Sequence, residues 1–464
     1  MPDQITARPP TAVRADGSTG VAERRVVTVV LVLLAAGLAA LSARGPLLGI
    51  AGVGVAGFVA ALAVLGRERV AFLAMMTAFA TAPMYKGIAP GGESTPITPT
   101  DLVFGIAVML LIPTLLRRSL RLPLTYIAGI SLILVTGTLS TITSVSPVIS
   151  ALQFVQWLVV ILGLLCLFAL WAPSWKKIDV LLWSYIAGQM VSIAYAPLGG
   201  AIGNRYQGLS HHPNEFGGAG VMAFAALMYL WRRNDAVWYR VVVALAGVAS
   251  GASVVASGSR AGVAVVAGLI VLIPIVERSA VKGFLLAIGC ALLVFALPYI
   301  VGQSGEGSAI SRLAGSADAL GADRARVEAQ DFGIDLFFQH PLIGNGFSDA
   351  LYVHNVVLGV ASSVGIFGLL GYLLVLYTLG RPIFGRHPNR RLCYVVAAFV
   401  AITPTFPGLE DRTLWVPMAP AILLAVQARL YGRHPEEGGH EAPAEPYASD
   451  RKRRLPTTAA WSDL

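Results

Sequence analysis

Charged residues and cysteines are both scarce in this sequence. Only 13% of the 464 residues are charged, whereas 56% are hydrophobic, and the mean hydropathy is +0.71. This balance excludes the two or three soluble domains that the length alone would predict. The three cysteines, Cys166, Cys290 and Cys393, all lie inside apolar segments. Their number and positions exclude a disulfide framework and give no metal-binding spacing.

Several nucleotide and metal motifs are also missing. The sequence contains no Walker loop, no dinucleotide-binding fingerprint and no zinc-protease signature. His211 and His212 are adjacent, but no further histidine or carboxylate stands at ligand spacing from them. We therefore expect no metal and no cofactor, and any reaction would use a substrate that arrives already activated.

Long apolar runs fill most of the chain. A helix needs about 20 apolar residues to cross the hydrocarbon layer of a membrane. Runs near this length occur at residues 26–43, 46–65, 70–85, 101–116, 123–143, 149–172, 178–198, 214–231, 239–256, 261–276, 282–301, 350–379, 392–406 and 413–431. They predict an all-α polytopic integral membrane protein with about 12–14 transmembrane helices.

The basic residues predict how the chain is oriented. Of the 34 Lys and Arg residues, 26 lie in the tails and in alternate loops, and the opposite loops hold the other eight. By the positive-inside rule, both termini are cytoplasmic. The net charge of +9 follows from this topology and from contact with anionic lipids, so we expect no nucleic-acid partner.

The chain divides into two tails and one membrane domain. Residues 1–25 are polar and form a cytoplasmic N-terminal tail, and the first apolar run resembles an uncleaved anchor. Residues 26–431 form the membrane domain. Residues 432–464 are rich in Pro, Glu, Arg and Ser, which predicts a disordered cytoplasmic tail.

The longest exterior loop covers residues 302–349. Within it, Val327, Ile334 and Phe338 recur near one face of a helix, which predicts an amphipathic helix at the membrane surface over residues 323–340. Pro341 would end this helix.

Three arginines and one histidine stand on the expected exterior side, where basic residues are unfavoured: Arg205, Arg260, Arg326 and His354. Arginine binds two phosphate oxygens at once and stays charged at any relevant pH. Histidine titrates near neutrality and can accept a proton from an attacking hydroxyl. These residue types indicate a site for an anionic, phosphate-bearing membrane substrate.

The residues around these positions support the same interpretation. His211, His212, Asn214 and Glu215 surround an expected helix start at Pro213, and a helix N-terminus favours phosphate. Further candidates for support are Arg324, beside Arg326, and Asn355, beside His354. Arg312 and Arg324 have the same potential as Arg326, with less support from the pattern.

Each position also has a structural explanation. Arg205 would cap a loop and pair with Glu215, and Arg260 would reach from a short turn to lipid headgroups. Arg326 and its neighbours would form a solvated face, and His354 would only pack.

Three segments carry a family resemblance. They are RYQGLSHHPNEFGGAGVMAFAAL, the turn SGSRAG, and RVEAQDFGIDLFFQHPLIGNGF leading to HNVVLGVASSVGIFGLLGYLL. In order and spacing they resemble the O-antigen ligase and polymerase superfamily, most clearly from residue 203 to residue 379. The resemblance implies transfer of a glycan from undecaprenyl pyrophosphate to an acceptor hydroxyl on a glycan, lipid or protein, at the exterior face of the cell membrane.

The resemblance also implies roles for residues. Arg205 and Arg326, with Arg260, would neutralise the pyrophosphate, and His354 would remove the acceptor proton. The reaction would invert the anomeric carbon and need no metal. The main alternative is a transporter or flippase of lipid-linked glycans, in which charges near the middle of the membrane would be expected.

Overall fold

The computed structural model describes residues 46–89, 98–199, 201–202, 204–303, 309–313, 317–406 and 408–431. The expected span at 26–43, both tails and parts of the exterior loops at 86–100 and 302–349 lie outside these residues. The chain forms two compact units, Met1–Val70 and Ala71–Leu464. The described part of the first contains α2 (Pro46–Leu65) and the beginning of α3 (Arg67–Thr81).

The second unit is helical apart from one short hairpin. Its helices after α3 are α4 (Pro99–Leu115), α5 (Leu124–Thr143), α6 (Pro147–Leu158), α7 (Leu165–Trp171), α8 (Trp175–Tyr195), α9 (Pro213–Leu230), α10 (Val237–Ala256), α11 (Arg260–Glu277), α12 (Ala280–Gln303), α13 (Ala309–Leu313), α14 (Ala317–Gln339), α15 (Val356–Gly380), α16 (Cys393–Ile402), α17 (Arg412–Met418) and α18 (Ile422–Tyr431). Strands β1 (Ala201–Ile202) and β2 (Arg205–Tyr206) pair antiparallel, with Ile202 opposite Arg205.

The all-α prediction is confirmed. Every apolar run predicted between residues 46 and 431 forms helical structure. Six segments of the described chain are long and apolar enough to cross a membrane: Leu124–Thr143, Pro147–Trp171, Trp175–Tyr195, Val237–Ala256, Arg260–Glu277 and Val356–Phe384. Several other runs form helices that are shorter or less apolar, so the described residues do not reach the predicted count of about 12–14 by this criterion. The architecture is that of a multi-pass membrane protein.

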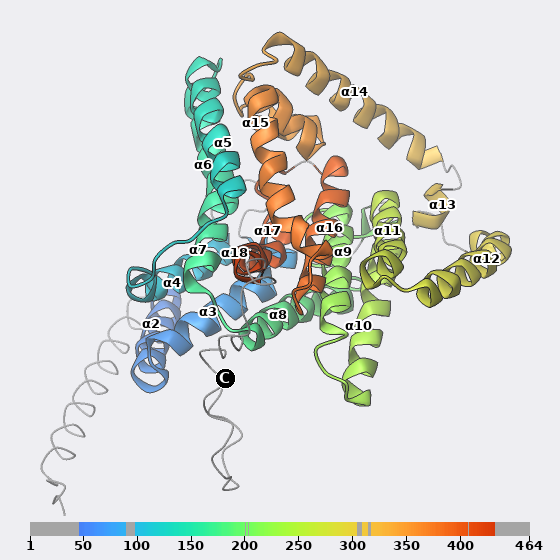
Figure 1. Cartoon of the computed structure of the whole chain (residues 1–464), viewed down its shortest axis with the longest axis horizontal. Helices are drawn as coiled ribbons and strands as arrows, with labels where there is room; N and C mark the ends of the chain where they lie inside the picture. The colour runs from blue at the N-terminus through green and yellow to red at the C-terminus, as the bar shows by residue number, and fades with distance from the viewer. Residues whose placement is uncertain are drawn as a thin grey trace, which may run out of the picture. The chain divides into compact units, whose positions relative to one another are not determined.

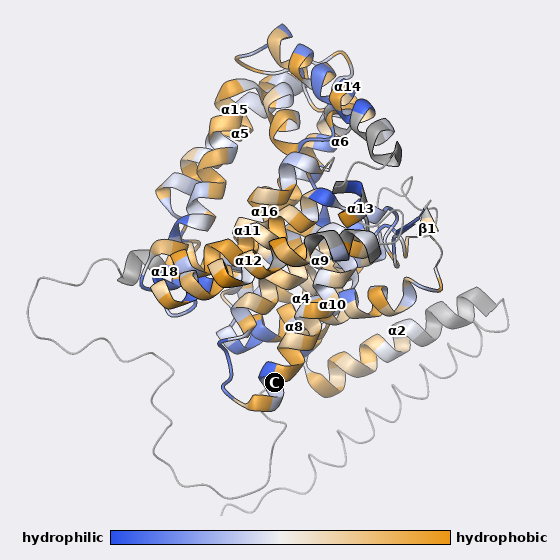
Figure 2. Cartoon of the chain, turned by 90° about the vertical axis from the view of Figure 1, so that its right-hand side faces the viewer, coloured by the Kyte–Doolittle hydropathy of each residue, from blue (hydrophilic) through white to orange (hydrophobic). Residues whose placement is uncertain are grey.

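Hydrophobic residues cover much of the surface of these helices. In the 18-residue apolar stretch of α10, only 28% is buried inside the protein, and in that of α11 only 22%. Figure 2 shows hydrophobic colours along much of the long helices and a mixture of hydrophilic and hydrophobic colours along α14. Exposed apolar surface on this scale indicates contact with lipid rather than with water.

Helix α9 lies at the centre of the second unit (Figure 1). Its small residues allow the neighbouring helices to pack closely against it. It packs against α8, α10, α11, α16 and α17. A Cβ atom on Gly217 would lie 2.5 Å from the Ser257 hydroxyl, and one on Gly220 would lie 2.5 Å from that of Ser253. Glycine thus lets the backbones approach closely, as is common where membrane helices pack.

Helix α15 is broken, which the apolar pattern does not predict. Gly365 has φ of 66° and ψ of −171°, a conformation that is essentially restricted to glycine. The segment after α14 docks at the break: Asn345 and Gly346 donate backbone hydrogen bonds to Ser362 and Ser363, at 2.9 and 3.0 Å. Ile366 donates to Pro341 at 2.9 Å. Neighbouring backbone therefore bonds to the groups that the break frees.

Candidate functional site

The site begins at the N-terminus of α9. His212 is the N-cap, and its Nδ1 accepts a 3.0 Å hydrogen bond from the backbone N–H of Asn214. Pro213 opens the helix, as predicted, because its fixed φ suits the first helical position. This bond requires an unprotonated Nδ1, so His212 is neutral here and acts as a cap. His211 is exposed beside it.

Two arginines bind to the end of α10. Arg205 Nε donates to the Ser257 carbonyl at 2.8 Å, and Arg312 donates to the Gly258 carbonyl at 2.7 Å. The carbonyls at a helix C-terminus carry partial negative charge, so they stabilise guanidinium groups. Arg205 also donates to Asn214 Oδ1 at 2.6 Å. The SGSRAG turn thus holds both arginines beside the start of α9.

The third arginine, Arg326, is placed by α14. This helix packs against α15 and the short helix η4 (Ala350–Val353). At the contact, a Cβ on Gly333 would lie 2.5 Å from Val353 and 2.9 Å from Leu358. Arg326 is seven residues before Gly333 and therefore lies on the same helical face, two turns away. The lack of a side chain at Gly333 is what allows this close contact.

His354 joins η4 to α15. Its φ of 51° and ψ of 26° are left-handed, which is uncommon for a residue other than glycine. Its side chain is exposed. The next residue, Asn355, is the N-cap of α15, and its Oδ1 accepts from the Leu358 N–H at 3.1 Å. A strained residue held between two helices is frequent at functional sites.

Electrostatic interactions link these residues. Burial, followed by the positive charges of Arg312 and Arg326, lowers the pKa of Arg205 to about 10. Although His354 is exposed, the protein removes part of the water around its ring, and this desolvation, followed by the charge of Arg326, lowers the pKa of His354 below its usual value. Arg205 therefore stays charged at neutral pH, and the neutral form of His354 is favoured. Three cations and one neutral base can bind an anion and accept a proton.

The remaining predicted residues lie around this cluster. Arg260 is half-buried at the first position of α11, two residues after Gly258. Arg324 is exposed on α14, about 200° around the helix axis from Arg326. Glu215 is buried and forms an ion pair with Lys86 at 2.7 Å. The hydrogen bonds of Arg205 are thus to Ser257 and Asn214 rather than to Glu215, the partner expected from the sequence.

A second group of charged residues lies next to the start of α9: Lys86, which pairs with Glu215, and the neighbouring Arg412 and Asp101. Arg412 forms an ion pair with Asp101 at 2.9 Å. The ring of Tyr85 lies 5.6 Å from Lys86 Nζ and 5.7 Å from the Arg412 guanidinium. Burial also raises the pKa of Glu410, so proton binding there is favoured.

Sequence reasoning undervalued Arg312 and missed Lys86 and Arg412. All three are among the eight basic residues of the expected exterior loops. Their rarity on that side was the one feature of the sequence that could have identified them as candidates. Arg312 is only 3% exposed, which no local pattern reveals. In the described part of the chain, no three His, Cys, Asp or Glu residues gather as metal ligands would.

The sequence was compared with models of protein families and with curated proteins, and neither comparison finds a match.

Proposed function

We propose that this protein is a membrane glycosyltransferase that transfers a glycan from undecaprenyl pyrophosphate to an acceptor hydroxyl. One observation carries the proposal: Arg205 and Arg312 both bond to the SGSRAG turn, and the positive charge of Arg326 acts on both Arg205 and His354. The resemblance to the O-antigen ligase and polymerase superfamily supports the same reaction.

The chemistry follows from charge. The oxygen of the acceptor hydroxyl attacks the anomeric carbon, and the bond from that carbon to the pyrophosphate oxygen breaks. His354, whose neutral form is favoured because desolvation and then the charge of Arg326 lower its pKa, takes the hydroxyl proton. Arg205, Arg312 and Arg326 stabilise the negative charge that develops on the leaving pyrophosphate. Inversion at the anomeric carbon is expected from this single displacement.

The position of the cluster favours transfer over transport. Arg205, Arg312 and His354 lie in a short strand, a short helix and a helix junction, outside the six candidate spans. A transporter or flippase of lipid-linked glycans would be expected to place charges in broken helices near the middle of the membrane. By the charge bias of the loops, the cluster faces the exterior of the cell membrane.

The test is glycan transfer by the purified protein with an undecaprenyl-pyrophosphate-linked oligosaccharide and candidate acceptors. We expect His354→Ala to lose transfer by about 10²–10⁴-fold and Arg326→Ala by about 10²–10³-fold. Arg324→Ala is the matched control, because it removes an exposed arginine from the other side of the same helix. Lipid-linked glycan that is bound and flipped but not transferred by the wild type would favour the transporter.

A further inference from the structure

A cavity lies at the other end of the helices that form the cluster. It is lined by residues of α9, α10, α11, α12, α16 and the segments beside them, and has a volume of about 540 Å³. Small-molecule pockets are typically about 300–1,000 Å³. Helix α9 begins at the cluster and ends beside this cavity, which separates the two sites by most of its length of about 27 Å.

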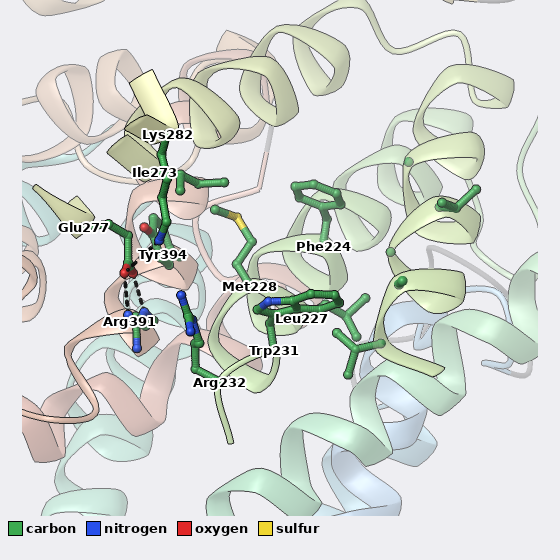
Figure 3. Close-up of a pocket in the computed structure, with 15 residues that line it drawn as sticks. Phe224, Leu227, Met228, Trp231, Arg232, Ile273, Glu277, Lys282, Arg391 and Tyr394 are labelled. Atoms are coloured by element: carbon green, nitrogen blue, oxygen red, sulfur yellow. Dashed lines mark hydrogen bonds and ion pairs between the residues drawn. The ribbon is translucent and has the colours of Figure 1, made fainter. Parts of the chain in front are cut away.

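The cavity is apolar at one end and charged at the other. Figure 3 shows Phe224, Leu227 and Trp231 on one side, and Arg232, Lys282 and Arg391 gathered on the other with Glu277. Arg391 donates to Glu277 at 2.5 Å, and Lys282 donates to it at 3.2 Å. Three basic side chains thus face one carboxylate, and the charged end has an excess of positive charge.

One polar group of the wall lacks a bond. Tyr394 is 2% exposed and lines the cavity between Glu277 and Lys282 in Figure 3. Within the described part of the chain, its hydroxyl has no hydrogen-bond partner. A buried hydroxyl without a partner costs free energy, which a ligand oxygen would recover.

Two glycines show that the apolar end is open. A Cβ built on Gly247 or Gly251 of α10 would meet no atom within 4 Å, although both line the cavity. Spacing of this kind is also used where membrane helices pack against each other. A second copy of the chain is therefore the main rival occupant.

We infer that this cavity binds an anionic phospholipid, independently of the proposed function. The acyl chain would lie along Phe224, Trp231 and the two glycines, and the phosphate would bind Arg232 and the Tyr394 hydroxyl. The excess of basic over acidic side chains favours an anionic headgroup. The loops at this end are those that the positive-inside rule places in the cytoplasm, where anionic lipids attract basic residues.

Native mass spectrometry of the full-length protein tests this inference with phosphatidylglycerol and phosphatidylcholine of identical acyl chains. We expect the wild type to retain phosphatidylglycerol preferentially. Gly251→Leu fills the cavity and should abolish retention, as should Gly247→Leu if the first variant does not fold. Gly268→Leu is the matched control, because it also adds a side chain in open space on a helix but does not line the cavity.

A second variant tests the headgroup. Arg232→Ala should lower the preference for phosphatidylglycerol by about fivefold, the effect of one basic residue near a lipid surface. Equal retention of both lipids by the wild type would overturn the inference, as would equal retention by Gly251→Leu and Gly268→Leu. Loss of a dimer in Gly251→Leu without loss of lipid would assign the cavity to a second copy.

Discussion

At the scale of single residues, Arg326 acts on both partners of the proposed reaction. Its positive charge lowers the pKa of Arg205 and that of His354. Neither effect needs direct contact, because charges interact over several ångströms where water is partly excluded. In the proposed reaction, the same side chain would bind the anion and favour the neutral form of the histidine.

This coupling predicts a change in pH dependence. Transfer requires neutral His354, so the rate falls as pH drops through its lowered pKa. Arg326→Gln removes the charge, the pKa of His354 rises toward its ordinary value of 6.5, and the acidic limb moves to higher pH. The pH profile of transfer, normalised to each variant's maximum, measures this. Arg326→Lys keeps the charge and should keep the limb in place. An unmoved limb in Arg326→Gln would disprove the coupling.

At the scale of elements, the docking of residues 341–346 onto the break in α15 positions the site. A Cβ on Gly344 would lie 2.2 Å from the Ser363 carbonyl oxygen, and one on Gly365 would lie 2.3 Å from that of Leu342. Both glycines also have positive φ. The turn and the break therefore require glycine on both sides, and together they place α14 beside η4 and His354.

Replacement of either glycine should loosen this arrangement. We expect Gly365→Ala to destabilise the protein by at least about 2 kcal/mol, because the side chain is strained and meets backbone. Thermal unfolding of the detergent-purified protein measures the loss. Gly105→Ala in α4 is the control, since its Cβ would meet nothing within 4 Å, and it should leave the midpoint unchanged or slightly higher. Equal midpoints for both variants would contradict the role of the break.

At the scale of the whole molecule, the two ends of α9 differ in how many basic residues lie in the loops beside them. Arg205, Arg312 and the Lys86–Glu215 pair lie at the N-terminal end of α9, where the loops hold few basic residues. The lipid cavity lies at its other end, next to basic loops. In the membrane, the proposed glycan transfer and the proposed lipid binding would thus take place on opposite sides.

Cysteine labelling in intact cells measures that orientation. In a background with Cys166, Cys290 and Cys393 replaced by Ala, we expect Ser348→Cys to react with a membrane-impermeant maleimide. Asn234→Cys should react only after the cells are permeabilised, because the positive-inside rule places it in the cytoplasm. The reverse pattern would invert the topology and refute an exterior active site.

The sequence by itself determined where the helices lie. Runs of about 20 apolar residues must form helices in lipid, because each backbone N–H and C=O then bonds within its own segment. It also singled out Arg205, Arg326 and His354, since basic residues in exterior loops require a reason.

Only the tertiary structure decided which of these residues meet. Arg312 and Arg324 have the same pattern in the sequence, yet Arg312 is buried on Gly258 while Arg324 is exposed. The partner of Glu215 is Lys86, 129 positions earlier. The break in α15 depends on backbone from residues 341–346. Contacts of this kind join distant segments through packing, and the periodicity of one segment carries no information about its neighbour.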